Sequence, residues 1–281
     1  MASQAVDAHH LAAVAVAEIA VVPVVAAMVA VAQAVVLEVT QMATHSADHA
    51  ETMAADREAA GAVALIAGAT GLVGIELLAL LLNDSACREV HSLVRKTSVK
   101  SHAKLHTHVV DFSKLGTASA ETLALPRLNE VYICLGTTLK VAGSQAAFRA
   151  VDFDAVLAVA RAGIARGATK LGVISAMGAS SSSGVFYSRT KGEMEDAIAK
   201  LGYQSTTVAR PSLLAGDREA LDQNIRTGEK IALAAMRIFN PLIPKNYAAV
   251  QASDVAAALL RQVRKGVAGQ TVLLSGQLQS R

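Results

Sequence analysis

The chain has 281 residues, a net charge of +3 and 53% hydrophobic residues, but only 3% aromatic ones. This length suits one α/β domain with a large core plus an extension. Lys and Arg are scattered and no motif combines aromatic with basic residues, so a nucleic-acid partner is not expected. The two cysteines, Cys87 and Cys134, cannot make a disulfide framework, which indicates a reducing compartment and a cytoplasmic location.

Residues 1–61 form an Ala/Val-rich extension with a different charge from the rest. They carry seven acidic side chains and one basic one, so their net charge is −6 and that of residues 62–281 is +9. Residues 19–37 contain no charge, which leaves three alternatives: a membrane anchor, a hydrophobic helix packed on the body or on a partner, or a low-complexity tail. His45 and His49 indicate an exposed helix face, because no further ligand cluster accompanies them, and no metal is expected.

A glycine-rich turn opens the predicted dinucleotide-binding domain, residues 62–281. A short apolar run ending at Ala67 predicts a buried strand, and residues 72–82 predict a helix. Gly68 allows a tight turn, Gly71 lets the backbone approach a pyrophosphate, and Gly74 lets the helix pack close to the strand. The helix start offers unpaired N–H groups to a phosphate. The residues expected to contact the dinucleotide here are Gly68, Thr70, Gly71, Leu72, Val73 and Gly74.

The next two predicted strands, residues 89–95 and 105–111, carry groups that suit the adenosine half of the cofactor. Arg95 and Lys96 would clamp a 2′-phosphate, which favours NADP over NAD; a solvated charge pair is the alternative. Asp111, followed by Phe112, could accept a hydrogen bond from the adenine amino group or instead cap a helix.

The fourth predicted strand, residues 130–135, runs into Gly136, Thr137 and Thr138. Ligands of open α/β sheets lie at the carboxyl ends of strands, so these residues are expected to contact the cofactor. The alternative is a plain turn with capping hydroxyls. A long helix is then predicted over residues 146–165.

The fifth predicted strand, residues 170–175, ends at Ser175, and Tyr187 and Lys191 follow. On a helix, positions four apart share a face, so Tyr187 and Lys191 would point the same way. A neighbouring ammonium lowers the pKa of a phenol, and the hydroxyl of Ser175 can hold a carbonyl oxygen. These three residues are the predicted catalytic unit for interconverting a carbonyl and an alcohol, against the alternative of a surface pair.

The remaining chain predicts a sixth strand over residues 205–210, a substrate lid or ordinary insertion near residues 211–250, and a closing strand over residues 270–274. Between them a helix is predicted to start with Ser253 as its N-cap and to end near Arg264. The alternation of strands and helices predicts a doubly wound parallel sheet, the Rossmann fold.

Residues 62–275 resemble the short-chain dehydrogenase/reductase superfamily in its atypical branch, and are similar to the Tat-interacting-protein-like group of NAD(P)-binding Rossmann proteins. The blocks that carry the resemblance are Gly68 to Gly74, Cys134 to Thr138, Val151 to Asp154, Tyr187 to Glu193, Arg210-Pro211 and Gly216 to Glu219. The resemblance implies cofactor contacts at the glycine turn, Arg95, Asp111, Gly136 to Thr138, Tyr187 and Lys191. Arg210 is also expected to contact the cofactor. It also implies hydride transfer with Tyr187 as acid/base, Lys191 as its activator and Ser175 as the carbonyl holder.

Two departures from the better-studied reductases bear on catalysis. Asp152 stands near the place where the superfamily often has Asn, and Ala176 replaces a second Ser. Three functions are therefore carried forward: an NADP-dependent oxidoreductase acting on a small carbonyl or alcohol, a cofactor-bound regulator with little or no turnover, and a sugar-nucleotide epimerase. A homodimer is expected from the resemblance, and a membrane partner only through residues 19–37.

Overall fold

The computed structural model describes residues 32–33, 36–42, 61–96, 101–115, 124–215 and 248–279. The chain divides into two compact units, Met1–Ala60 and Gly61–Arg281. In the first unit, residues 32–33 and 36–42 are helical and exposed. No helix within the described ranges is both long and apolar enough to cross a membrane. Most of the candidate span 19–37, together with His45 and His49, lies outside the described residues.

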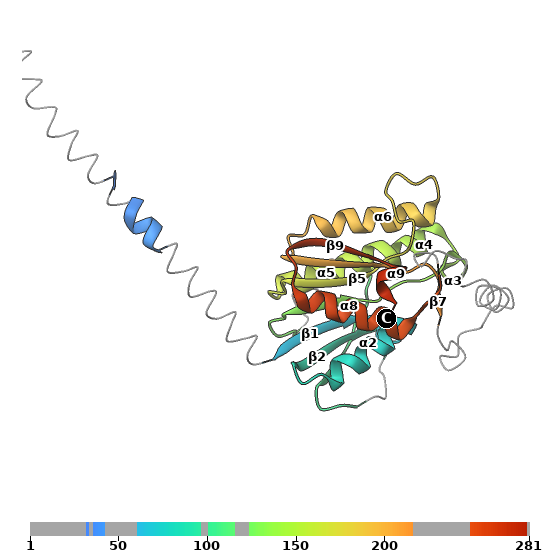
Figure 1. The fold of residues 1–281 in the computed structure, drawn as a ribbon, viewed down its shortest axis with the longest axis horizontal. Helices are drawn as coiled ribbons and strands as arrows, with labels where there is room; N and C mark the ends of the chain where they lie inside the picture. Colours follow the sequence, from blue (N-terminus) through green and yellow to red (C-terminus); the bar gives the residue numbers. More distant parts are fainter. Residues whose placement is uncertain are drawn as a thin grey trace, which may run out of the picture. The chain divides into compact units, whose positions relative to one another are not determined.

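The second unit is built on a seven-stranded parallel sheet in the order β3-β2-β1-β4-β5-β6-β9 (Figure 1). Every neighbouring pair is parallel, so each connection crosses over the sheet. The strands are β1 (Ala62–Ala67), β2 (Cys87–Val94), β3 (Leu105–Val109), β4 (Glu130–Ile133), β5 (Lys170–Ile174), β6 (Ser205–Arg210) and β9 (Gly269–Leu274). This topology confirms the predicted doubly wound sheet.

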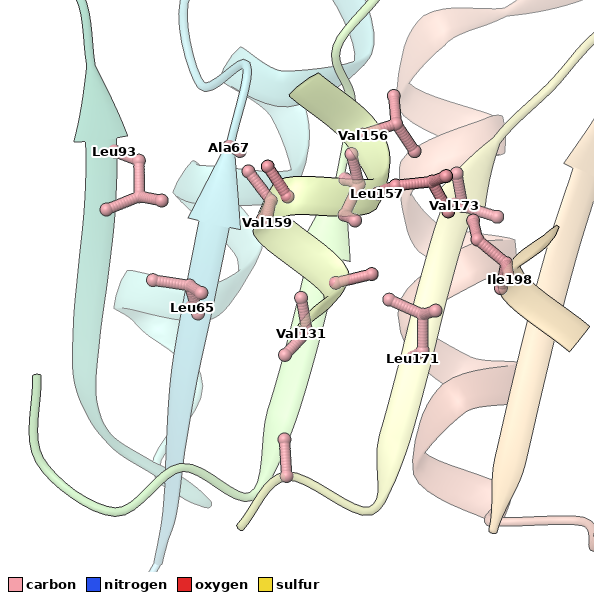
Figure 2. Packing of buried hydrophobic residues seen from close by; sticks show 14 of the residues in the cluster. Leu65, Ala67, Leu93, Val131, Val156, Leu157, Val159, Leu171, Val173 and Ile198 are labelled. Carbon is pink, nitrogen blue, oxygen red and sulfur yellow. The ribbon is translucent and has the colours of Figure 1, made fainter. Parts of the chain in front are cut away.

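Helices cover both faces of the sheet because its strands are apolar on both sides. Leu65 packs in a core with α5 (Val156–Ala165) and α6 (Phe186–Ala199), whereas its neighbour Ile66 packs in a second core. The second core contains α2 (Leu72–Asn83), α8 (Ala252–Lys265) and α9 (Ser275–Leu278). Figure 2 shows α5 over one face, with Leu65, Val131 and Leu171 beneath it. Near-continuous apolar runs are typical of such strands.

The helix predicted over residues 146–165 is a composite of three segments. It comprises α4 (Gln145–Arg149), a π-helical segment η2 (Ala150–Ala155) and α5. Ser144 caps its start by accepting a hydrogen bond from the Ala147 N–H at 3.1 Å. Asp152 lies in the π-helical segment and is fully buried. π-helical turns often occur at functional sites. A short helix that the sequence did not predict, α3 (Leu139–Ala142), precedes α4.

The start of α8 differs from the prediction. Its N-cap is Gln251 and not Ser253, which is the second residue of the helix. The chain is held extended up to Gln251 because β8 (Val250–Gln251) pairs in parallel with β7 (Leu214–Ala215). Residues 216–247, most of the predicted substrate region, lie outside the described part of the chain.

A polar network joins the last turn of α8 to the amino end of β4. The buried Tyr132 hydroxyl donates to Glu130 Oε2 at 2.8 Å, and Arg264 Nε lies 3.6 Å from the same oxygen. Arg264 also forms an ion pair with Asp84, in the connection between α2 and β2. These contacts lie at the edge of the sheet opposite the carboxyl ends of the strands.

Candidate functional site

The turn after β1 has the geometry that the three glycines predict. Gly68 has φ +86°, and a Cβ there would lie 2.5 Å from the Cys134 carbonyl. A Cβ on Gly74 would lie 2.0 Å from the Gly68 oxygen, so both positions require glycine for the packing of the protein itself. At Gly71 a Cβ would be in ordinary contact, 3.5 Å from the Gly68 oxygen. The packing of the chain itself therefore does not require glycine at position 71, and it leaves space beside the Gly71 backbone.

The first turn of α2 is open to an anion. Its N-cap is Gly71, no side chain caps it, and it contains no acidic residue. Its backbone N–H groups and the helix dipole together favour a phosphate. Among the side chains predicted to contact cofactor, Thr70 is exposed, but Val73 is buried in the core and Leu72 packs against it. For Val73, any contact with a phosphate must be made by the backbone.

The adenosine-side residues are accessible. Arg95 and Lys96 directly follow β2 and are exposed, and within the described ranges neither makes an ion pair. Asp111 follows β3, where its Oδ1 accepts hydrogen bonds from the Ser113 hydroxyl and N–H at 2.6 and 3.0 Å. These bonds, with Lys114 nearby, hold the pKa of Asp111 below its usual value. Asp111 thus caps a turn and not a helix, which was the alternative that the sequence left open, while Phe112 packs against the core.

The loop after β4 has structural roles besides any contact with a ligand. Thr138 is the N-cap of α3, where its Oγ1 accepts from the Val141 N–H at 3.2 Å, as the capping alternative expected. The Thr137 N–H donates to Asp152 Oδ2 at 2.8 Å. A Cβ on Gly136 would lie 3.4 Å from Asp152 Oδ1 and 3.9 Å from Lys191 Nζ. The loop is therefore anchored to the π-helical segment.

Lys191 and Asp152 form a buried ion pair. Lys191 Nζ lies 2.7 Å from Asp152 Oδ1, and the two residues are 3% and 0% exposed. Since the second carboxylate oxygen of Asp152 accepts from Thr137, the pair is held on both sides. The charge of Lys191 is thus neutralised by a partner within the protein.

Ser175 belongs to a second buried group. Its hydroxyl donates to Glu195 Oε1, and Glu195 is 3% exposed. Arg210 contacts the same carboxylate with two groups, Nε at 3.1 Å from Oε1 and Nη2 at 2.5 Å from Oε2. Arg210 therefore lies beside the carboxylate that Ser175 contacts, but its guanidinium is already paired with Glu195.

Tyr187 lies on the same helix face as Lys191, as its spacing predicts, but its pKa differs from the expectation. Burial, reinforced by the negative charge of Asp152, raises the pKa of Tyr187 to about 12. The predicted lowering by Lys191 is wrong, because the ammonium is paired with Asp152. The phenol also packs beside Phe148, with ring centroids 5.5 Å apart. At neutral pH, Tyr187 carries its proton.

The sequence did not single out Glu195 as a site residue, and it did not predict that Asp152 pairs with Lys191. Glu195 lies four residues after Lys191 and eight after Tyr187, so the three share one face of α6. A carboxylate on the inward face of a helix indicates a buried polar partner, and this signal was present in the spacing. The pairing of Asp152 with Lys191 joins residues from separate elements, so no local pattern could reveal it.

Curated relatives identify the family. The chain is 34% identical over 157 residues to Protein FMP52, mitochondrial, from Candida albicans, covering 55% of this chain and 68% of the relative. It is 37% identical over 163 residues to the Emericella nidulans protein of that name, covering 56% and 68%. The chain belongs to the FMP52 family. No family model matches it.

Solved structures agree with this assignment at the level of the fold. The Helicobacter pylori ADP-L-glycero-D-manno-heptose-6-epimerase has a TM-score of 0.56 at 14% identity, over 76% of each chain. The Bordetella bronchiseptica enzyme WbmG in complex with NAD has a TM-score of 0.56 at 15% identity, over 77% of this chain and 73% of WbmG. The FMP52-family chain thus shares the Rossmann-like α/β fold of these proteins, as its motifs predicted.

The location expected from the sequence is corrected by the same comparison. A cytoplasmic location was inferred from the cysteine count, whereas the FMP52 relatives are named mitochondrial. The physical reason for the error is that two cysteines exclude only an oxidising compartment. The mitochondrial matrix and the cytoplasm are both reducing, so composition does not separate them.

Proposed function

We propose that this FMP52-family protein is an NADP-dependent reductase of a small carbonyl compound. The observation that carries the proposal is the protonated Tyr187 on the face of α6 that also presents Lys191, next to the loop after β4. A phenol that holds its proton at neutral pH is equipped to donate it to a developing alkoxide. We also propose that the protein acts in mitochondria, as the names of its relatives suggest.

The residues around the glycine turn fit a dinucleotide. The open first turn of α2 suits the pyrophosphate, and the space above Gly71 lets the backbone approach it. Arg95 and Lys96 would hold the 2′-phosphate, which distinguishes NADP from NAD. The nicotinamide supplies a hydride when bound, and the chain supplies position and the proton.

The protonation state of Tyr187 suits it to one of the two half-roles in carbonyl–alcohol interconversion. Carbonyl reduction needs a proton donor, and Tyr187 is in that state at every pH well below about 12. Alcohol oxidation needs the phenolate, which burial and Asp152 disfavour. Tyr187 is therefore equipped to supply the proton of a carbonyl reduction at neutral pH, whereas the direction of net turnover depends on substrate and cofactor concentrations.

A regulator with little or no turnover is the second candidate, and one observation favours it. The Ser175 hydroxyl donates its single proton to Glu195, so it must leave that carboxylate in order to hold a substrate carbonyl. A protein that binds NADPH without reducing a substrate has no need of a free Ser175. The epimerase hypothesis stays a prediction, because residues 216–247 lie outside the described chain.

The two candidates differ in the effect of Tyr187→Phe. For a reductase, the substitution should lower the rate of NADPH oxidation across a panel of small carbonyls at least about 100-fold, since general acid catalysis contributes 10²–10⁴-fold. The Kd for NADPH, measured by calorimetry, should change less than about threefold, because the phenol makes at most one of many contacts.

Ser188→Ala is the matched control, since Ser188 is half-buried on the same helix but on another face. It should retain the rate of the unsubstituted protein. Tight NADPH binding with no turnover of any carbonyl by the unsubstituted protein would reject the reductase and leave the regulator.

A further inference from the structure

Four titratable side chains gather on one face of the sheet, away from the glycine turn and from Tyr187. Glu89 and His91 lie two residues apart on β2, and His106 and His108 lie two residues apart on β3. Side chains two residues apart point to the same face of a strand. His91 and His106 are register partners in the parallel pair β2–β3, so both strands present their groups to the same side. We call these four residues the histidine cluster.

The cluster continues the face that carries the core beneath α5. His91 is also the register partner of Leu65 on β1, which belongs to that core (Figure 2). Where β1 and β4 offer apolar side chains, the edge pair β2–β3 offers imidazoles and a carboxylate. His91 is only 5% exposed, whereas His106 is exposed at the rim.

The distances bring the ligand atoms of the cluster close together. Glu89, His91 and His106 each offer one ligand atom, and those atoms lie within 4.8 Å of one another. His91 Nε2 lies 3.3 Å from Glu89 Oε2, and His91 Nδ1 lies 2.9 Å from His108 Nε2. Two ligands of a tetrahedral zinc ion, with bonds of about 2.0–2.1 Å, are about 3.3 Å apart. The contact of His91 with Glu89 already has this separation.

We propose that the histidine cluster binds one divalent transition-metal ion such as Zn²⁺. Glu89, His91 and His106 are the ligands, and His108 holds His91 through its other ring nitrogen. Imidazole nitrogens with one carboxylate suit zinc, whereas Mg²⁺ and Ca²⁺ prefer sites made of oxygen alone. A second partner on the far nitrogen of a ligating histidine is common, because it fixes the tautomer that offers a lone pair to the metal.

Binding requires a small movement at the rim. The rings of His91 and His106 are stacked, with centroids 4.8 Å apart and planes 16° apart. Because each nitrogen lone pair lies in the plane of its ring, the His106 ring must turn toward the ion. His106 is exposed, so it can turn without displacing a packed neighbour. Arg88 contacts the other oxygen of Glu89 at 3.2 Å and, being mostly exposed, leaves Oε2 available.

The ion would fasten the edge strand β3 to β2. A bound metal stabilises only the folded chain, so Zn²⁺ should raise the melting temperature. Through its ligands it would join two strands whose connection includes residues 97–100, which lie outside the described residues.

The test compares His106→Ala with His102→Ala in the full chain after treatment with a chelator. Both residues are exposed, but His102 lies outside the cluster, where its Nδ1 accepts from the Lys104 N–H at 3.1 Å. Zn²⁺ binding is measured by calorimetry and by the melting temperature, with Mg²⁺ as a second probe. The absorption spectrum of bound Co²⁺ reports tetrahedral coordination.

We expect the unsubstituted protein and His102→Ala to bind Zn²⁺ equally and Mg²⁺ not at all. In His106→Ala the affinity for Zn²⁺ should fall by at least about 100-fold, because even the loss of an outer partner costs 10–100-fold. Glu89→Gln should weaken binding in the same direction. Besides His102, the chain has four further histidines outside the cluster that could also bind Zn²⁺, so the comparison of variants is needed to assign the site: His9, His10, His45 and His49. Equal affinity in His106→Ala and the unsubstituted protein would place the ion elsewhere and overturn the proposal.

Discussion

Asp152 decides the electrostatics of the candidate site at the scale of single residues. The sequence predicted that Lys191 would act on Tyr187, and this would hold if the ammonium had no other partner. The Asp152 carboxylate instead pairs with Lys191 at 2.7 Å. The result is a phenol whose pKa rises to about 12 while the ammonium remains close by. Two buried charges are retained at a cost in desolvation, which suggests a role beyond stability.

Asp152→Asn should lower the pKa of Tyr187 by about one to three units. The substitution removes a negative charge that disfavours the phenolate and leaves Lys191 free to favour it. A lower pKa means that the phenolate appears at lower pH. The measurement is tyrosinate absorbance between pH 8 and 10.5, taken as the difference from the same variant carrying Tyr187→Phe. The exposed Asp154 offers the control Asp154→Asn, which should leave this pKa unchanged. No difference between the two variants would show that Asp152 does not control Tyr187.

Arg95→Ala should weaken NADPH much more than NADH. An exposed guanidinium at the end of β2 would hydrogen-bond the 2′-phosphate, and a bond to a charged group contributes about 1.5–3 kcal/mol, or about 10- to 100-fold in Kd. Only NADPH carries that phosphate. Calorimetric Kd values for both cofactors check this, with Arg261→Ala as an exposed cation on α8 for comparison. Equal loss for the two cofactors would remove the argument for NADP.

At the scale of elements, the position of α6 depends on one close approach. A Cβ on Gly192 would lie 2.1 Å from the Ser181 backbone nitrogen, so the helix lies against the loop that follows β5. Tyr187, Lys191 and Glu195 all depend on this placement because they share the helix.

Gly192→Ala should destabilise the protein by about 1–3 kcal/mol and reduce turnover, since backbone must move to admit the methyl group. Gly184→Ala is the control, because a Cβ there meets nothing within 4 Å. Its effect should stay within about 0.5 kcal/mol. Urea unfolding measures both. A neutral Gly192→Ala would mean that α6 has more freedom than its packing implies.

Whether a segment forms a helix or a strand could be predicted from the sequence where the residue types favour one of the two. Residues 205–210 form β6 as predicted, because the consecutive β-branched residues Thr206, Thr207 and Val208 favour a strand. The π-helical segment could not be predicted, since its residues satisfy an α-helical pattern equally well. The pairing β7–β8 was missed because each strand has two residues. Motif spacing gave Tyr187 and Lys191 a common face, but their charge partners depend on contacts between distant elements.

At the scale of the whole second unit, Arg264 connects three parts of the chain. It pairs with Asp84 after α2 and approaches Glu130 at the start of β4, from its own place in the last turn of α8. Glu130 is 3% exposed, and Arg264 Nε lies 3.6 Å from its carboxylate.

Arg264→Ala should lower the free energy of unfolding by about 3 kcal/mol, because it leaves a buried carboxylate without its cation. Arg261→Ala, on an exposed position of the same helix, should change it by less than about 0.5 kcal/mol. The urea midpoint with an unchanged slope reports the difference. Equal effects would show that Glu130 finds another partner when Arg264 is lost.

The Arg264 network has a consequence for how such a chain can evolve. It lies at the amino ends of the strands, whereas Ser175, Gly136 and the glycine turn lie at the carboxyl ends. Substitutions distant from one another with no shared partner act additively. A substitution that stabilises the fold at the amino ends of the strands can therefore offset a destabilising one at their carboxyl ends. Substitutions around Tyr187 can then accumulate without loss of folding, as long as Arg264 keeps its partners.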